Sequence, residues 1–239
     1  MKNFIYGKKP VQNTIVNFTN LIKHIYVLKG FSFDRDVYKV IKEKNISWSS
    51  LDKEKFNNLI HEKVNHQGII ADMKEYNYRS MKDIIGNEQE QTILVLDRIQ
   101  DPNNFGSIIR SAVLFGVKGI VILDHNQVDV TPAVIKSSAG TIYNIPIVKV
   151  SNLSNAINML KEKGYWIYCS YLSDTSTDIR NIKFDKKSVI IMGSEGDGVM
   201  KKIANQSDFC FSIPTNKAID SLNVSVAAGI ILFTKNLSA

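Results

Sequence analysis

The chain has few cysteines and no long apolar run. Its 239 residues include only two cysteines, Cys169 and Cys210, whose spacing fits neither a disulfide framework nor a zinc site. We expect both to be reduced and buried. No segment approaches the roughly 18 consecutive apolar residues of a membrane span, and the first residues lack the apolar core of a signal peptide. The cytoplasm is therefore the expected compartment, without a membrane partner.

Two functional patterns are also missing. The four histidines show no metal-ligand spacing, so we expect no metal site. No glycine-rich segment has the form G-x-G-x-x-G, which disfavours a nucleotide-dependent oxidoreductase.

Positive charge is in modest excess. The chain has 30 Lys and Arg against 23 Asp and Glu, a net charge of +7. Residues 1–90 hold 15 basic and 11 acidic residues, and residues 91–239 hold 15 and 12. Such an excess suits a polyanionic partner, although an ordinary solvated surface explains it equally well. Only five of the basic residues are arginines, whose planar guanidinium binds carboxylate or phosphate at two points.

The hydrophobic pattern divides the chain into two α/β parts. Residues 1–75 combine a glycine turn, short helices and the apolar runs KHIYVLKG and HQGIIADM. Residues 76–90 are polar and predict a linker with at most one short helix. From residue 91 onward, runs such as TILVLD, GIVILD and SVIIMG are continuously apolar, as in strands of a parallel sheet covered on both faces. Functional loops are expected at the strand ends.

The first such loop follows TILVLD and leads into the segment NNFGSIIRSAVLFGV. Asn103 or Asn104 is the expected N-cap of a helix, and Gly106 allows something to approach the backbone closely. Arg110 then lies about one turn inside the helix and reaches back toward its N-terminus. Its charge opposes the helix dipole there unless an anion is bound, although a surface arginine that covers apolar neighbours is the simpler interpretation of this helix alone.

The second loop, after SVIIMG, runs through Gly193 and Glu195 and has the form G-x-x-G-x-G. Its glycines expose backbone groups, and Glu195 can bond a substrate hydroxyl or hold an arginine, or can simply be solvated. The third loop follows a short strand that ends at Ile213, before Pro214. It leads to Ser221, the expected N-cap of the last helix, and to Asn223.

Together and in this order, the three loops resemble the SpoU (TrmH-type) family of SPOUT RNA methyltransferases. The matching elements are N-x-G-x-x-x-R at residues 104–110, the acidic glycine loop at 193–198 and S-L-N-V-S at 221–225. YGKKPVQ, HIYVLKG and NHQGIIADM near the front also resemble the accessory domain of the bacterial 23S ribosomal RNA 2'-O-guanosine methyltransferases. The resemblance covers nearly the whole chain.

This resemblance implies a fold and a set of partners. It implies a small ribosomal-protein-like RNA-binding domain at residues 1–75, a linker at 76–90 and a SPOUT catalytic domain at 91–239. The catalytic domain would have a C-terminal trefoil knot, a rare exception to unthreaded topology, and the protein would be a homodimer with the active site near the subunit contact. S-adenosylmethionine would bind to backbone groups of Gly193, Ile213 and Leu222.

The implied reaction is methylation of an RNA ribose 2'-hydroxyl, with 23S rRNA as the expected partner. The catalytic residues would be Asn104, Arg110, Glu195, Ser221 and Asn223. Because a guanidinium keeps its proton at physiological pH, we interpret Arg110 as a phosphate and alkoxide ligand rather than a base. A tRNA target, or a non-catalytic rRNA-binding assembly factor, remains an alternative.

Overall fold

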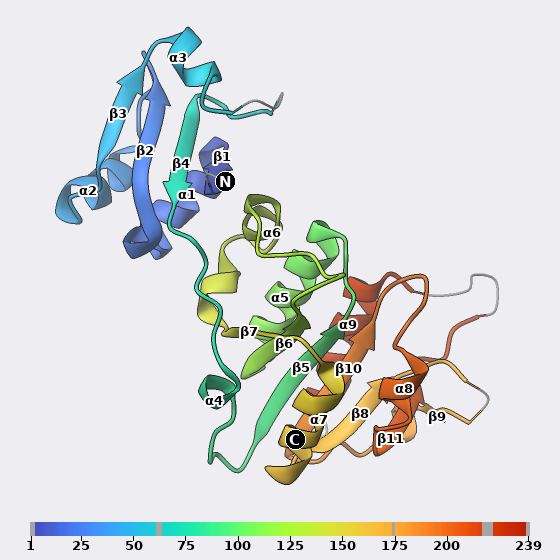
Figure 1. Ribbon diagram of the computed structural model, residues 1–239. Helices are drawn as coiled ribbons and strands as arrows, with labels where there is room; N and C mark the ends of the chain where they lie inside the picture. The colour runs from blue at the N-terminus through green and yellow to red at the C-terminus, as the bar shows by residue number, and fades with distance from the viewer. Residues whose placement is uncertain (1–2, 61–63, 174, 217–221, 238–239) are drawn as a thin grey trace.

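The structure, a computed structural model, describes residues 3–60, 64–173, 175–216 and 222–237 and contains two sheets (Figure 1). The smaller sheet has the order β1-β4-β2-β3, with β4 antiparallel to both neighbours and β3 parallel to β2. Its strands and helices are β1 (Asn3–Tyr6), α1 (Lys8–Asn17), η1 (Thr19–Leu21), β2 (Ile22–Leu28), α2 (Arg35–Glu43), β3 (Trp48–Leu51), α3 (Lys53–Asn57) and β4 (Ile69–Met73).

Apolar side chains alternate along these strands and give the small sheet two apolar faces. Ile25 and Val27 of β2 belong to the same buried cluster as Val11 of α1 and Val37 of α2. On the other face, Phe56 of α3 belongs to a smaller cluster with Phe4 and Ile70.

The larger sheet has seven strands in the order β7-β6-β5-β10-β8-β11-β9, and all neighbouring strands are parallel. The strands are β5 (Gln91–Asp97), β6 (Gly119–Leu123), β7 (Ile147–Val150), β8 (Trp166–Ser170), β9 (Thr177–Asp178), β10 (Lys187–Gly193) and β11 (Phe209–Ser212). The parallel α/β sheet predicted from the continuous apolar runs is confirmed, and β6 is buried along its whole length.

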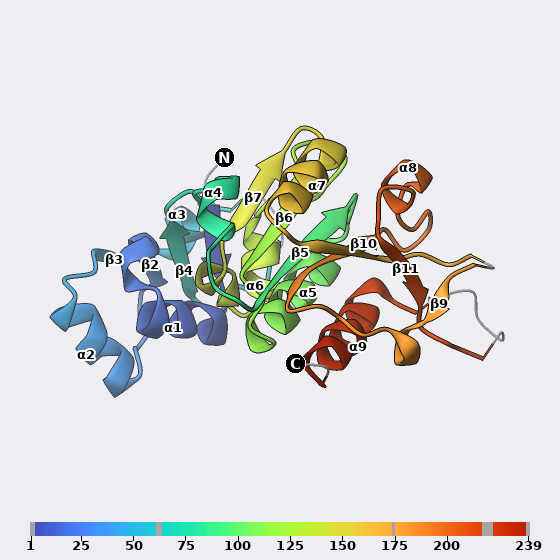
Figure 2. The same cartoon turned by 90° about the horizontal axis from the view of Figure 1, so that it is seen from below.

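Helices cover both faces of this sheet (Figure 2). One face carries α5 (Pro102–Leu114), α6 (Pro132–Ser137) and α9 (Val224–Leu237), whose apolar residues cluster with Leu94 and Ile190. The other face carries α7 (Leu153–Glu162) and α8 (Lys201–Ala204), which cluster with Ile93 and Val189. Short 3-10 turns η2 (Thr141–Asn144) and η3 (Ile179–Asn181) lie between strands. No described helix is long and apolar enough to cross a bilayer.

The segment between the sheets, which includes α4 (Met81–Ile84), is held against the larger sheet. The Tyr76 hydroxyl accepts a hydrogen bond from the Ile147 backbone N–H at 3.2 Å, and the Tyr78 hydroxyl accepts one from that of Val130 at 2.9 Å. The Arg79 backbone N–H donates to the Ile147 carbonyl at 2.8 Å. The segment predicted as a linker is therefore bonded along its first residues and follows the edge of the sheet beside β7.

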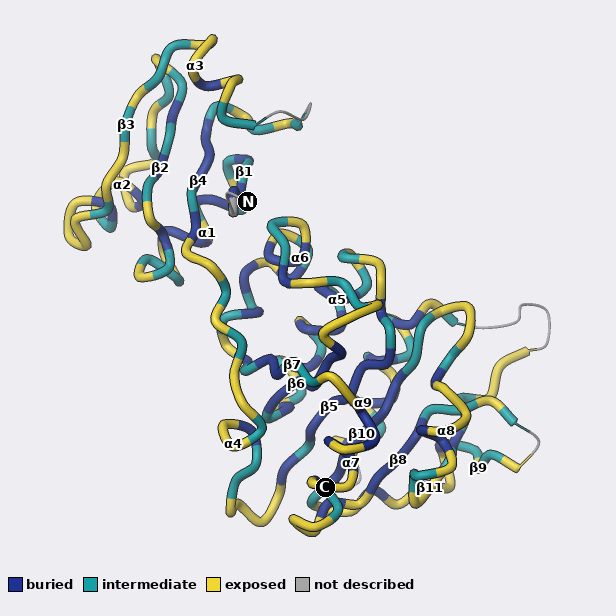
Figure 3. The backbone as a smooth tube through the Cα atoms, in the orientation of Figure 1, coloured by how far each residue is buried: buried dark blue, intermediate teal, exposed yellow. Residues whose placement is uncertain are grey.

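The part with the smaller sheet also contacts the part with the larger sheet directly, where α6 packs near β1 (Figure 1). Asn13 Nδ2 of α1 donates to the Ala139 carbonyl at 2.8 Å, and the rings of Phe18 and Tyr143 lie 5.1 Å apart. The buried positions in Figure 3 concentrate in the strands of both sheets. The front unit is therefore attached to the larger sheet by side-chain contacts as well as by the chain.

The two cysteines are adjacent in this core. Cys169 of β8 is the register partner of Cys210 of β11, and both are free thiols. Burial raises the pKa of the Cys169 thiol to about 12, so it stays protonated and unreactive at neutral pH. The prediction of reduced thiols agrees with this, although Cys210 is only half-buried.

Candidate active site

The site begins where two neighbouring strands end. Asp97, the last residue of β5, is the register partner of Gly193, the last residue of β10. Because both strands are parallel, their following loops leave from the same edge of the sheet. The first and second loops singled out from the sequence therefore lie side by side (Figure 1).

The helix after β5 begins earlier than expected. Asp101 is its N-cap, with a carboxylate oxygen that accepts from the backbone N–H of Asn103 and Asn104 at 2.8 Å each, and Pro102 occupies the first helical position. The predicted N-cap at Asn103 or Asn104 is therefore wrong. Because Asn104 does not cap the helix, its side chain can hydrogen-bond to the loop after β10.

Asn223 caps the last helix. Its Oδ1 accepts from the backbone N–H of Ser225 at 2.9 Å and of Val226 at 3.4 Å, and helix α9 begins at Val224. Ser221, the cap expected from the sequence, lies outside the described residues. Since the amide oxygen of Asn223 faces its own helix, its Nδ2 group points outward.

Asn104, Glu195 and Asn223 form one hydrogen-bonded cluster, which we call the amide–carboxylate cluster. Glu195 Oε1 accepts from Asn104 Nδ2 at 2.5 Å and from Asn223 Nδ2 at 2.7 Å. Asn223 Nδ2 also donates to Asn104 Oδ1 at 3.0 Å. The cap bonds fix the orientation of the Asn223 amide, and this in turn fixes that of Asn104. Glu195 Oε2 has no hydrogen bond to any described residue, so it is available to a ligand.

A cavity of about 320 Å³ opens beside this cluster. It is lined by Arg98, Ile99, Gln100, Asp101, Asn104, the loop Ser194–Asp197 and Val224. The structure thus brings three of the five predicted catalytic residues into one cluster, and two of them, Asn104 and Glu195, line this cavity.

A second cavity, of about 150 Å³, lies at the ends of β8 and β11. Its lining includes Ile213 and Leu222, two of the three residues predicted to hold the cofactor, together with Leu172, Phe211 and Ala227. Ser170, Tyr171, Ser212 and Thr215 complete the lining. Apolar walls with a few hydroxyls and backbone groups fit an adenosine-type cofactor.

Comparison with known proteins identifies this arrangement. Residues 91–233 match the model of the SpoU rRNA Methylase family, and residues 4–79 match a model described as RNA 2'-O ribose methyltransferase substrate binding. The chain belongs to the SpoU rRNA methylase family. The resemblance found in the three loops is therefore confirmed, and with it the class of enzyme, an RNA 2'-O-ribose methyltransferase.

Relatives match over nearly the full length. A TrmH family tRNA/rRNA methyltransferase of Staphylococcus haemolyticus is 33% identical over 235 residues, which are 96% of this chain and 93% of the relative. The SpoU methyltransferase AviRb from Streptomyces viridochromogenes, solved with AdoMet, superposes with a TM-score of 0.82 at 19% identity over 98% of this chain and 89% of its own. The A. aeolicus TrmH/SpoU tRNA modifying enzyme has 26% identity and a TM-score of 0.57, and covers 66% of this chain and 80% of its own.

Arg110, another of the predicted catalytic residues, is not part of the amide–carboxylate cluster. It lies in the C-terminal half of α5, more than one turn inside, because the helix begins at Pro102. Its side chain is exposed, does not line the cavity, and has no hydrogen bond or ion pair to any described residue. Its role remains a prediction.

Two of the four glycines in these motifs, Gly106 and Gly193, serve packing. A Cβ on Gly106 would lie 2.0 Å from Ser137 Oγ, so the group that approaches the helix closely is α6, and Gly106 does not hold the cleft open. A Cβ on Gly193 would lie 2.0 Å from the Gly198 carbonyl carbon, so this glycine lets the loop fold back over its own strand. Gly193 lines neither cavity described above.

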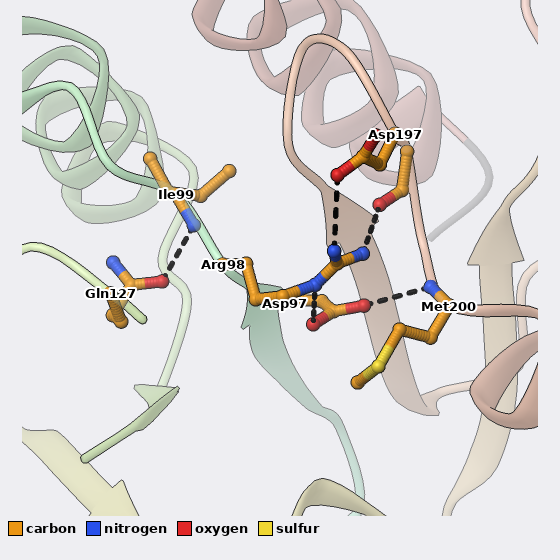
Figure 4. A network of polar contacts seen from close by, with 7 residues as sticks. Asp97, Arg98, Ile99, Gln127, Asp197 and Met200 are labelled. Carbon is orange, nitrogen blue, oxygen red and sulfur yellow. Dashed lines mark hydrogen bonds and ion pairs between the residues drawn. The ribbon is translucent and has the colours of Figure 1, made fainter. Parts of the chain in front are cut away.

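Sequence reasoning missed Arg98, which lies directly after β5. Its guanidinium donates to Asp97 Oδ1 at 3.0 Å, to Asp197 Oδ2 at 3.2 Å and to the Gly198 carbonyl at 3.1 Å (Figure 4). The hydrogen bond to Asp97, and then the negative charges of Asp97 and Asp197, raise the pKa of Arg98. The scarcity of arginines was the available signal, but two of the guanidinium's three partners, Asp197 and Gly198, lie about a hundred residues away in sequence.

Proposed function

We propose that this chain transfers a methyl group from S-adenosylmethionine to the 2'-hydroxyl of a guanosine ribose in 23S rRNA. The observation that carries the proposal is the amide–carboxylate cluster, which faces one cavity while a second, more apolar cavity lies at the neighbouring strand ends. Two adjacent cavities suit a reaction in which a cofactor and an RNA ribose bind side by side.

The second cavity suits the cofactor. Backbone groups of Ile213 and Leu222 would hold it, and the apolar side chains around them would pack against an adenine ring. Bound there, the cofactor supplies a methyl group on a sulfonium, which is already an excellent leaving group. Gly193 would contribute indirectly, by allowing the loop that carries Glu195 to close.

The protein's remaining task is to position the ribose hydroxyl. A well-oriented pair of reacting atoms about 3–3.5 Å apart needs little further assistance. In this proposal the available Oε2 of Glu195 accepts a hydrogen bond from the 2'-hydroxyl, while Asn104 and Asn223 hold the carboxylate in place. Arg110 binds the phosphate of the target nucleotide and stabilises the developing alkoxide. Ser221 stays a predicted catalytic residue.

We further propose that the protein is a homodimer. Leu114, Val226, Phe233 and Leu237 are exposed apolar residues at the end of α5 and along α9. A partner that covers this stripe would be a second copy, as in the family that the sequence resembles. Arg110 is on α5 and makes no hydrogen bond or ion pair with the described residues of its own chain, so in a dimer it would serve the site near the subunit contact.

The front unit favours ribosomal RNA over tRNA. Residues 4–79 match a substrate-binding model, whereas the A. aeolicus tRNA modifying enzyme leaves about a third of this chain unmatched. We therefore propose an RNA-binding domain at residues 1–75, joined through 76–90 to a catalytic domain at 91–239 with a C-terminal trefoil knot. A cytoplasmic location follows from a ribosomal substrate. A tRNA target remains the second candidate, because the Staphylococcus haemolyticus relative is described for both RNAs.

The test is methylation of separate RNA pools. The purified protein is incubated with labelled S-adenosylmethionine and either rRNA or tRNA, and the labelled ribose is mapped. We expect 2'-O-methylguanosine in 23S rRNA, and slower but still measurable labelling by Glu195→Gln, which keeps the side-chain size but removes the charge. Label in tRNA alone would move the assignment to the second candidate, and a folded protein that labels neither pool would indicate a non-catalytic assembly factor.

A further inference from the structure

Arg98 has a backbone conformation that its residue type disfavours. Its φ of 62° lies in the left-handed region, which few residues other than glycine adopt without strain. Such a conformation persists only where surrounding contacts impose it. Here the contacts are three hydrogen bonds made by one guanidinium, whose side chain is only 22% exposed.

These bonds connect the end of β5 to the loop after β10 (Figure 4). Asp97 is fully buried, and its Oδ1 accepts from Arg98 while its Oδ2 accepts from the Met200 backbone N–H at 2.8 Å. The Arg98 side chain then bonds Asp197 and Gly198. The loop after β10 is thus held by hydrogen bonds at Asp197, Gly198 and Met200, near its C-terminal end.

Glu195 lies on this same loop, two residues before Asp197. The loop closes on itself through a bond from the Gly198 N–H to the Ser194 carbonyl at 3.0 Å, so Glu195 is enclosed between tethered residues. Arg98 and Glu195 also line the same cavity. Holding Asp197 and Gly198 therefore restricts where the Glu195 carboxylate can lie.

We propose that Arg98 is a positioning residue for the methyl transfer, acting as a three-point clamp that fixes Glu195 in place. The inference rests on the proposed function, because it concerns the carboxylate assigned there to the ribose hydroxyl. Arg98 is not itself a phosphate ligand in this assignment, since Asp97, Asp197 and the Gly198 carbonyl already occupy its guanidinium.

The conservative substitution Arg98→Lys tests the clamp. A lysine ammonium can still pair with the buried Asp97 carboxylate, but it is a single point charge and cannot span Asp97, Asp197 and Gly198 together. We expect kcat to fall by roughly tenfold, because small displacements at a reacting centre are costly, while the KM for S-adenosylmethionine stays within about twofold.

The decisive measurement is a double-mutant cycle with Glu195→Gln. If Arg98 acts through Glu195, then Arg98→Lys lowers kcat in the wild-type background but changes it by less than about twofold in the Glu195→Gln background. An equal loss of kcat in both backgrounds would overturn the proposal. Arg180→Lys is the matched control and should leave kcat unchanged, because among the described residues the Arg180 side chain pairs only with the nearby Asp178.

Hydrogen exchange of the loop separates this inference from the proposed function. In the free protein, Arg98→Lys should speed the exchange of the amides at 195–200 at least about fivefold while the amides of β5 stay protected. Unchanged exchange would refute the clamp even if the enzyme is active. If Glu195→Gln alone retains full activity, the role assigned to Glu195 in the reaction is wrong. Faster loop exchange in Arg98→Lys would in that case still show that Arg98 holds the loop in place.

Discussion

The substitution Asn223→Asp probes the amide–carboxylate cluster without disturbing the helix that it caps. Aspartate is as good an N-cap as asparagine, so the bonds to Ser225 and Val226 are retained and α9 keeps its start. The change replaces only the outward Nδ2 group by an oxygen. That group donates to Glu195 Oε1 at 2.7 Å and to Asn104 Oδ1 at 3.0 Å.

The free energy lost in Asn223→Asp can be worked out from these contacts. A lost hydrogen bond to a charged acceptor amounts to about 1.5–3 kcal/mol. Two carboxylate oxygens held at the former 2.7 Å repel by about 1.5 kcal/mol even at the dielectric constant of water, which is appropriate because both residues are exposed. The sum, about 3–4.5 kcal/mol, predicts a methyl-transfer rate reduced by roughly 100-fold to 2,000-fold if the cluster is needed in the transition state.

The assay is methyl incorporation into RNA with saturating S-adenosylmethionine, compared with Asn223→Ser. Serine can still cap α9 but is too short to reach Glu195, so it removes the bond without adding a charge, and we expect a smaller loss of roughly 10-fold to 100-fold. Lowering the pH toward about 5.5 should restore part of the activity of the aspartate variant alone, because a proton shared between the two carboxyls replaces the missing amide hydrogen. Wild-type rates in both variants, with unchanged thermal midpoints, would refute the reasoning.

Three further results are expected. Gly106→Ala places a Cβ 2.0 Å from Ser137 Oγ, so it should destabilise the fold by about 1–3 kcal/mol, and a thermal midpoint equal to that of the wild type would contradict the packing role of this glycine. Phe233→Asp puts a charge into the exposed stripe on α9 and should convert the proposed dimer to monomers in sedimentation measurements; a wild-type protein that is already monomeric argues against the dimer. Arg110→Lys should leave folding unchanged and lower turnover by at least roughly tenfold, and near-normal turnover with RNA bound would remove the case for a two-point guanidinium contact.

Much of the larger sheet could be predicted because its signals are local. Continuous apolar runs bounded by polar loops specify buried parallel strands, and the loops that follow them must gather at one edge. This logic found Asn104, Glu195 and Asn223, which the structure brings together. The short edge strands escaped notice, because β3 has the sequence WSSL and only alternate residues of it are half-buried.

Other features depend on partners that the sequence does not reveal. The cap at Asp101 was visible in principle, since an aspartate before a proline is a common helix start. The role of Gly106 was not, because it depends on α6, about thirty residues further along the chain. The left-handed backbone of Arg98 was equally hidden, because two of the three partners that hold its side chain, Asp197 and Gly198, are distant in sequence.

The charge around the cavity indicates which part of an RNA nucleotide enters it. The lining contains three carboxylates, those of Asp101, Glu195 and Asp197, and a single guanidinium, which Asp97 and Asp197 already pair. Such a lining repels a phosphate group but accepts hydrogen bonds from a hydroxyl or a base edge. A ribose could therefore enter while its phosphates stay outside, where an exposed and unpaired cation is required. Arg110 is exposed and makes no hydrogen bond or ion pair with a described residue, and this agrees with its proposed role at the subunit contact better than with a place inside the cleft of its own chain.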